Sequence, residues 1–167
     1  GYTEPIWHGR TRPAHGEVLA GRRAIEIAES SKASLYIVHI TTAGLLNQIT
    51  SARKRGVSVM GETCPQYLFF TQEDLLRPDG ANWVCSPPLR TVDDNKALWK
   101  GLSDSSIQTV GTDHCPFFAD GATAIRYDGQ QLAIPGKELG KSDFTRIPNG
   151  LPTIEHRLSL LWTFGVS

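Results

Sequence analysis

Histidine and carboxylate side chains recur at the ends of three short apolar runs in this chain. His39 lies near the end of the first run, Glu62 follows the second and Asp113 follows the third. A neutral imidazole and a carboxylate are both ligands of zinc, and a carboxylate also transfers protons as a general acid or base. His39 and Asp113 are therefore candidate metal ligands. A hydrogen-bonded, buried role stays open for His39, and a turn-capping role stays open for Asp113.

The other titratable side chains are interpreted as structural. We expect Glu62 to form hydrogen bonds in a loop, and His114 to support the structure beside Asp113. His8, His15 and His156 lie in segments without a partner pattern, which favours surface or loop positions.

Three cysteines are present, and they are widely spaced: Cys64, Cys85 and Cys115. An odd and sparse set argues against a disulfide framework, and a thiolate zinc site needs closely paired cysteines. We expect three small, buried and reduced side chains.

The candidate residues need a scaffold, and the hydrophobic pattern predicts alternating helices and strands. Short β-favouring runs are typical of strands buried on both faces of a parallel sheet. Strands are predicted at 35–40, 57–60 and 107–111. Apolar residues at helical spacing predict helices at 17–28, 45–55 and 95–102. This order indicates an α/β fold with parallel strands and right-handed crossovers. Ligand sites in such folds gather at the carboxyl ends of the strands, where the candidate residues lie.

Composition and charge exclude several classes of protein. The 167 residues carry 17 Lys and Arg against 17 Asp and Glu, so no excess positive charge is available for nucleic acid or an anionic membrane. With 40% hydrophobic and 20% charged residues, the chain has the composition of a folded protein. No apolar run approaches the ~20 residues of a membrane helix. We expect a cytoplasmic protein that binds neither nucleic acid nor membrane.

Four sequence motifs follow one another along the chain: GETCPQYL at 61–68, SPPLR at 86–90, TDHCPF at 112–117 and DFTRIPNG at 143–150. In this order they resemble the dihydropyrimidinase and D-hydantoinase family of cyclic amidohydrolases. The resemblance covers nearly the whole chain. It implies a TIM-type (β/α)8 barrel in which the three predicted strands are the sixth to eighth. Such a barrel has eight strands in ~250 residues, so we expect residues 1–167 to be its incomplete C-terminal part, without the upstream strands and the small β-rich domain.

The resemblance also implies roles for four residues. His39 and Asp113 would be ligands in a centre of two zinc ions, and Asp113 would also be the catalytic proton shuttle. Ser86 and Asn149 would hold the cyclic substrate through their backbone groups. The carboxylated lysine that bridges the two metals in this family, and the family's further ligands, have no counterpart in the chain.

The implied reaction is hydrolytic ring opening of a cyclic amide. The full-length protein, which we expect to be a homotetramer, would use a metal-bound hydroxide to convert a dihydropyrimidine or a 5-substituted hydantoin to an N-carbamoyl amino acid. We expect the isolated chain to be inactive.

Three questions stay open at the level of sequence. A non-catalytic binding protein like the collapsin response mediator proteins is one alternative function. Another cyclic amidohydrolase, such as allantoinase or dihydroorotase, is a second. Residues 119–141 look like an insertion, either a loop that affects substrate access or a solvated variable loop.

Overall fold

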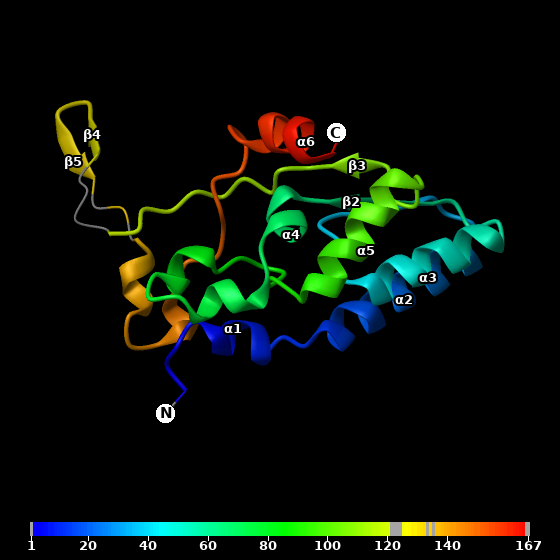
Figure 1. Ribbon diagram of the computed structural model, residues 1–167, viewed down its shortest axis with the longest axis horizontal. Coiled ribbons are helices and arrows are strands. Elements are labelled where there is room, and N and C mark those ends of the chain that lie inside the picture. The colour runs from blue at the N-terminus through cyan, green and yellow to red at the C-terminus, as the bar shows by residue number, and fades with distance from the viewer. Residues whose placement is uncertain (1, 121–124, 133, 135, 166–167) are drawn as a thin grey trace.

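A computed structural model describes residues 2–120, 125–132, 134 and 136–165 of the chain. Its centre is a parallel sheet with the strand order β1 (Leu35–Ile37), β2 (Val59–Thr63), β3 (Thr109–Val110) (Figure 1). The register pairs Ile37 with Gly61, and Thr63 with Val110. The predicted α/β pattern of parallel strands is confirmed.

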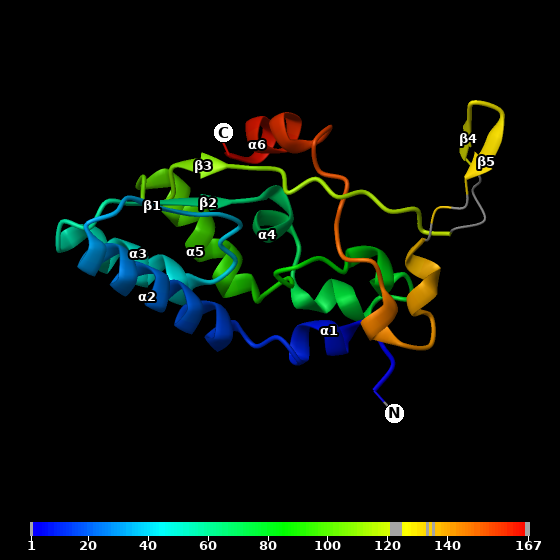
Figure 2. The ribbon, with the colours of Figure 1, turned by 180° about the vertical axis from the view of Figure 1, so that it is seen from behind.

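Three helices cover one face of this sheet, at the positions that the hydrophobic pattern predicts (Figures 1 and 2). They are α2 (Ala14–Ser31), α3 (Ala43–Lys54) and α5 (Val92–Ser103), and α3 packs against both of the others. Thr42 and Thr91 begin α3 and α5 by accepting hydrogen bonds from the backbone of the first turn. The core between helices and sheet is apolar and includes Ile40, Leu45, Ile49, Leu98 and Ile107.

The boundaries of the strands differ from the prediction. The first strand ends at Ile37 because the chain turns at His39, whose φ of 42° is incompatible with a β ladder. The second strand extends to Thr63 and therefore contains Glu62, which is paired with Thr109. The expectation that Glu62 lies in a loop is wrong, because the pairing with β3 keeps it extended.

Several short elements had no clear signal in the sequence. They are α1 (Ile6–Arg10), α4 (Pro65–Phe69), α6 (Arg157–Gly165), the antiparallel hairpin of β4 (Ile125–Tyr127) and β5 (Gln130–Leu132), and the 3-10 turns η1 (Gln72–Leu76), η2 (Gly80–Trp83), η3 (Lys137–Gly140) and η4 (Phe144–Arg146). The hairpin stands away from the sheet (Figure 2). It falls within the expected insertion at 119–141, of which 121–124, 133 and 135 lie outside the described residues.

The sheet face opposite the helices carries exposed side chains. Tyr36 and its register partner Met60 are both 45% exposed. In the described part of the chain, β1 and β3 each pair with β2 alone within this sheet. The described helices include none with the length and apolar character needed to cross a bilayer.

Candidate active site at the carboxyl ends of the strands

His39 follows β1 and begins the connection to α3. Its side chain is half-buried and its backbone lies in the left-handed region, which costs an L-residue roughly 1–3 kcal/mol. The backbone amide and the backbone carbonyl of the next residue, Ile40, are both hydrogen-bonded to β2. The Ile40 amide donates to the Glu62 carbonyl at 2.7 Å, and the Thr63 hydroxyl donates to the Ile40 carbonyl at 2.8 Å. These bonds fix His39 at the edge of the sheet.

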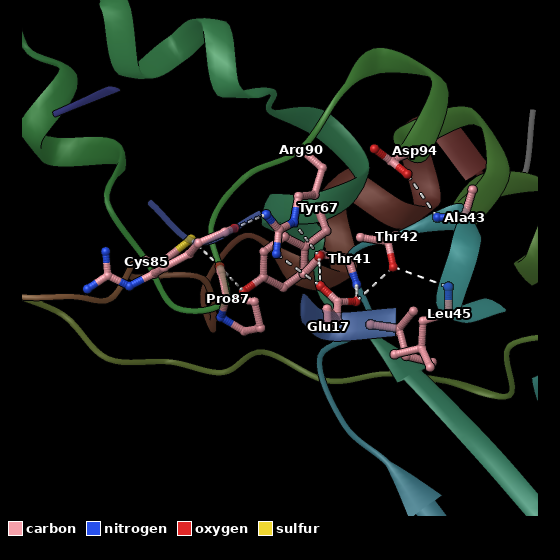
Figure 3. A network of polar contacts seen from close by, with 12 residues as sticks. Glu17, Thr41, Thr42, Ala43, Leu45, Tyr67, Cys85, Pro87, Arg90 and Asp94 are labelled. Carbon is pink, nitrogen blue, oxygen red and sulfur yellow. Dashed lines mark hydrogen bonds and ion pairs between the residues drawn. The ribbon is translucent and has the colours of Figure 1, made fainter. Parts of the chain in front are cut away.

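A largely buried ion pair of Glu17 and Arg90 holds the two residues that come after Ile40 (Figure 3). The Glu17 carboxylate accepts hydrogen bonds from the Thr41 amide at 2.9 Å, the Thr41 hydroxyl, and the Thr42 hydroxyl at 3.1 Å. Arg90 lies 3.3 Å from Glu17 and also donates to Thr41 Oγ1 at 3.0 Å and to the Arg12 carbonyl at 2.6 Å. Because all these groups are paired, the charges are tolerated in the interior, and the loop after His39 is held by several hydrogen bonds.

Asp113 follows β3 and is exposed. Its backbone is also left-handed, with φ 47°. Residues on both sides of it are bonded to Thr153, since the Thr112 carbonyl accepts from the Thr153 hydroxyl and His114 Nδ1 accepts from the Thr153 amide at 3.1 Å. His114 thus has the structural role expected of it. In the described chain the segment after Asp113 is irregular, so Asp113 caps no helix there.

The negative charge of Asp113 affects the pKa values of two buried thiols, those of Cys64 and Cys85. The pKa of the Cys85 thiol is raised to about 12, chiefly by burial, and the negative charge of Asp113 contributes against the opposing effects of Tyr67, Lys137 and Arg90. Burial likewise raises the pKa of the Cys64 thiol, with Asp113 as the next contribution. The chain after Asp113 is hydrogen-bonded to the loop that follows Asn149, since the Cys115 amide donates to the Leu151 carbonyl at 3.1 Å. All three cysteines are unpaired, but Cys115 is exposed, contrary to the expectation that every cysteine is buried.

Glu62 lies on the open face of the central strand. Its carboxylate accepts a hydrogen bond from the Tyr36 hydroxyl at 2.7 Å, and this hydroxyl also lies 2.6 Å from Thr109 Oγ1. The hydrogen-bonding role expected for Glu62 is confirmed, although it acts across three strands rather than in a loop. A Cβ at Gly111 would lie 2.5 Å from Glu62 Oε1, so glycine makes room for this carboxylate beside β3.

Ser86 and Asn149, 63 residues apart in the sequence, are in direct contact. The Ser86 hydroxyl donates to Asn149 Oδ1 at 3.1 Å, and both side chains are exposed. The Gly150 amide donates to the Val84 carbonyl at 3.0 Å and joins the two loops a second time. Ser86 also lines an open pocket of about 460 Å³ together with His39. The structure thus brings three of the four predicted site residues to one edge, and the chain just after Asp113 is hydrogen-bonded to the loop that follows Asn149.

The donor types at this edge suit a divalent metal, but they are too few to hold one. Imidazole and carboxylate are common zinc ligands, and a zinc site uses about four. The described residues contain no group of three or more His, Cys, Asp and Glu side chains arranged to hold a metal ion. His39 and Asp113 can contribute to a metal site only with ligands from elsewhere.

Sequence reasoning missed two buried basic side chains near the Ser86 segment, a histidine and a lysine. His8 is 1% exposed, and its Nε2 lies 2.8 Å from the Cys85 carbonyl, so the expected surface position is wrong. Lys137 is 3% exposed and donates to the Val84 carbonyl at 2.7 Å. No local spacing identifies either residue, because their partners are distant in the sequence.

Known proteins share both the sequence and this arrangement of strands and loops. No protein-family model matches the chain. The D-hydantoinase of Streptomyces coelicolor is 45% identical over 163 residues, which are 96% of this chain and 32% of that protein. The crystal structure of the D-hydantoinase from Bacillus sp. AR9 aligns over 99% of this chain and 34% of its own, with a TM-score of 0.88 and 43% identity. This chain is a homologue of the D-hydantoinases and dihydropyrimidinases.

The aligned region covers nearly the whole of this chain, but it covers only about a third of each D-hydantoinase. The dihydropyrimidinase structure from Brevibacillus agri aligns with 97% of this chain at 44% identity and a TM-score of 0.85, and 32% of that structure is covered. The chain spans about a third of the length of the relatives that it matches. It contains the elements that carry the four sequence motifs, and the rest of a hydantoinase has no counterpart among these residues.

Proposed function

We propose that this chain forms the C-terminal part of the catalytic barrel of a cyclic amidohydrolase of the hydantoinase and dihydropyrimidinase type. The observation that carries the proposal is the common edge of the sheet. His39 after β1 and Asp113 after β3 both take left-handed backbone conformations. The Ser86–Asn149 pair meets His39 at a shared pocket, and the chain after Asp113 is hydrogen-bonded to the Asn149 loop. Strained residues at the ends of parallel strands are typical of functional sites.

The exposed face of the sheet supports the assignment to a TIM-type (β/α)8 barrel. Tyr36 and Met60 point away from the three covering helices and are half exposed, as barrel-interior residues are when strands are missing. Such a barrel closes with eight strands, and its active site lies at their carboxyl ends. In the proposed full-length protein, upstream strands pair with the free edge of β1 and with that of β3.

Asp113 is the proposed catalytic residue of this chain. Its exposed carboxylate can accept a proton from the attacking water and deliver it to the ring nitrogen that leaves. His39 and Asp113 are the proposed contributions of the chain to a centre of two zinc ions. When bound, such ions polarise the scissile carbonyl and lower the pKa of water toward ~7.

Ser86 and Asn149 are the proposed substrate-binding residues. Their backbone groups lie in two loops that are hydrogen-bonded to each other, which suits the recognition of neighbouring polar groups on one ring. Such contacts bind the ring and hold it beside the reacting groups. The proposed substrate is a dihydropyrimidine or a 5-substituted hydantoin, which opens to an N-carbamoyl amino acid.

The test uses a protein of the relatives' length that contains these residues. We expect it to open dihydrouracil or a 5-substituted hydantoin, to lose activity with a chelator and to regain it with zinc. Asp113→Asn removes the proton acceptor and keeps a residue type that tolerates the left-handed backbone. We expect this variant to lose at least ~1,000-fold in kcat, within the range of general acid–base catalysis. Asp93→Asn, an exposed change on α5, is the control.

Separate outcomes distinguish the alternatives. Full activity of Asp113→Asn refutes the role of Asp113. A folded protein without bound metal and without activity favours a binding protein, and preferential opening of allantoin or dihydroorotate favours another cyclic amidohydrolase. The mass of the protein in solution tests the proposed homotetramer. The isolated chain is expected to be inactive, and turnover by it would refute the need for further metal ligands.

A further inference from the structure

Lys137 is a buried cation whose charge has an unusual set of partners. It begins η3 and is 3% exposed. Its Nζ donates to the main-chain carbonyls of Val84 at 2.7 Å and Gly150 at 2.9 Å. Within the described residues it forms no ion pair with a carboxylate. A buried ammonium without a counterion is costly, and burial lowers the pKa of Lys137 to about 8. Because burial of this ammonium is costly, we expect Lys137 to have a specific structural or functional role.

The two carbonyls belong to the loops that carry the proposed substrate contacts. Val84 precedes Ser86 by two residues, and Gly150 directly follows Asn149. The Gly150 amide donates to the same Val84 carbonyl, and the side chains of Ser86 and Asn149 are hydrogen-bonded. Lys137 therefore closes a ring of hydrogen bonds behind the Ser86–Asn149 pair, on the buried side of both loops.

A third segment is attached to the same lysine. The Lys137 amide donates to the Phe118 carbonyl at 2.7 Å, and its ammonium lies 5.8 Å from the centre of the Phe117 ring. This segment leads directly from Asp113. One residue thus connects the chain after the proposed catalytic carboxylate with both proposed substrate loops, because its ammonium donates to two carbonyls from different loops.

We propose that Lys137 is a positioning residue for substrate binding, which sets the separation of the Ser86 and Asn149 backbone groups that receive the imide edge of a cyclic amide. The inference rests on the proposed function, since it takes these two residues as the substrate contacts. Lys137 itself does not touch the substrate. Its effect is on the spacing of the loops, so that it determines affinity for the ring rather than the rate of the chemical step.

The test compares Lys137→Met with Lys141→Met in the full-length protein. Methionine keeps the length of the side chain and removes its donors, and the exposed Lys141 controls for loss of a positive charge in the same segment. We expect Lys137→Met to raise KM for dihydrouracil or hydantoin about tenfold or more. We expect kcat to change less than about threefold and the metal content to stay the same. The reason is that the lost interaction stabilises the bound substrate and the transition state equally. Lys141→Met should leave KM unchanged.

A second variant covers the case in which Lys137→Met does not fold. Lys137→Gln keeps an amide donor. If both variants fold, we expect its KM to lie between that of the wild type and that of Lys137→Met. If only Lys137→Gln folds, we expect its KM to exceed that of the wild type. An unchanged KM in both variants, or a parallel loss of kcat and metal, overturns the inference alone. A wild-type protein that opens no cyclic amide overturns the proposed function and this inference together.

Discussion

Protonation of His8 is expected to destabilise the fold in mild acid. The imidazole is buried, and its Nε2 lies 2.8 Å from the Cys85 carbonyl, in the segment that leads to Ser86. The carbonyl can only accept, so Nε2 carries the proton of a neutral ring. The pKa of His8 is lowered from 6.5 to about 4, chiefly by burial and also by the charges of Arg12, Lys137 and Arg90, while the hydrogen bond to the Cys85 carbonyl acts in the opposite direction.

The sign and size of the effect follow from proton linkage. Between about pH 6.5 and pH 4 the unfolded chain binds a proton at His8 and the folded protein does not, so stability falls as the pH falls through this window. The difference in pKa corresponds to about 3 kcal/mol when fully developed, and to about 2 kcal/mol at pH 5.

The assay is urea unfolding at about pH 7.5 and about pH 5, with His8→Gln as the perturbation. Glutamine keeps a neutral N–H donor for the Cys85 carbonyl and does not titrate in this range. We expect the wild type to lose about 2 kcal/mol more than His8→Gln between the two pH values. His15→Gln, which replaces an exposed histidine, should behave like the wild type. An equal loss in the wild type and in His8→Gln would refute the assignment of a buried neutral imidazole.

Two further perturbations test how the loops of the site are held. Removing one partner of the largely buried Glu17–Arg90 pair, by Glu17→Gln or Arg90→Met, should lower the free energy of unfolding in urea by about 3–5 kcal/mol. The double variant should lose clearly less than the sum of the two single variants. Strictly additive losses would contradict the pairing. Gly150→Ala should be more destabilising than Gly129→Ala, because both glycines have positive φ but only at Gly150 would the new Cβ meet a neighbour, the Cys115 carbonyl oxygen, at 2.3 Å. Equal melting temperatures for these two variants would contradict the close packing at Gly150.

Local patterns in the sequence determined the framework of this protein. Short, nearly unbroken β-favouring runs predicted the three parallel strands, and apolar residues at a spacing of three to four predicted the helices α2, α3 and α5. The same patterns placed His39 and Asp113 at the carboxyl ends of strands. The motifs around Ser86 and Asn149 indicated the family, which the homology to D-hydantoinases bears out.

Only the tertiary structure decided how the site is held together. Lys137, His8 and Arg90 reach carbonyls and carboxylates that are dozens of residues away in the sequence, and no spacing rule relates such partners. Burial decides their chemistry, since the same histidine or lysine in water would be an ordinary surface residue. The meeting of Ser86 with Asn149 is likewise a property of packed loops, in which a buried ammonium fixes two backbone segments that the sequence leaves independent.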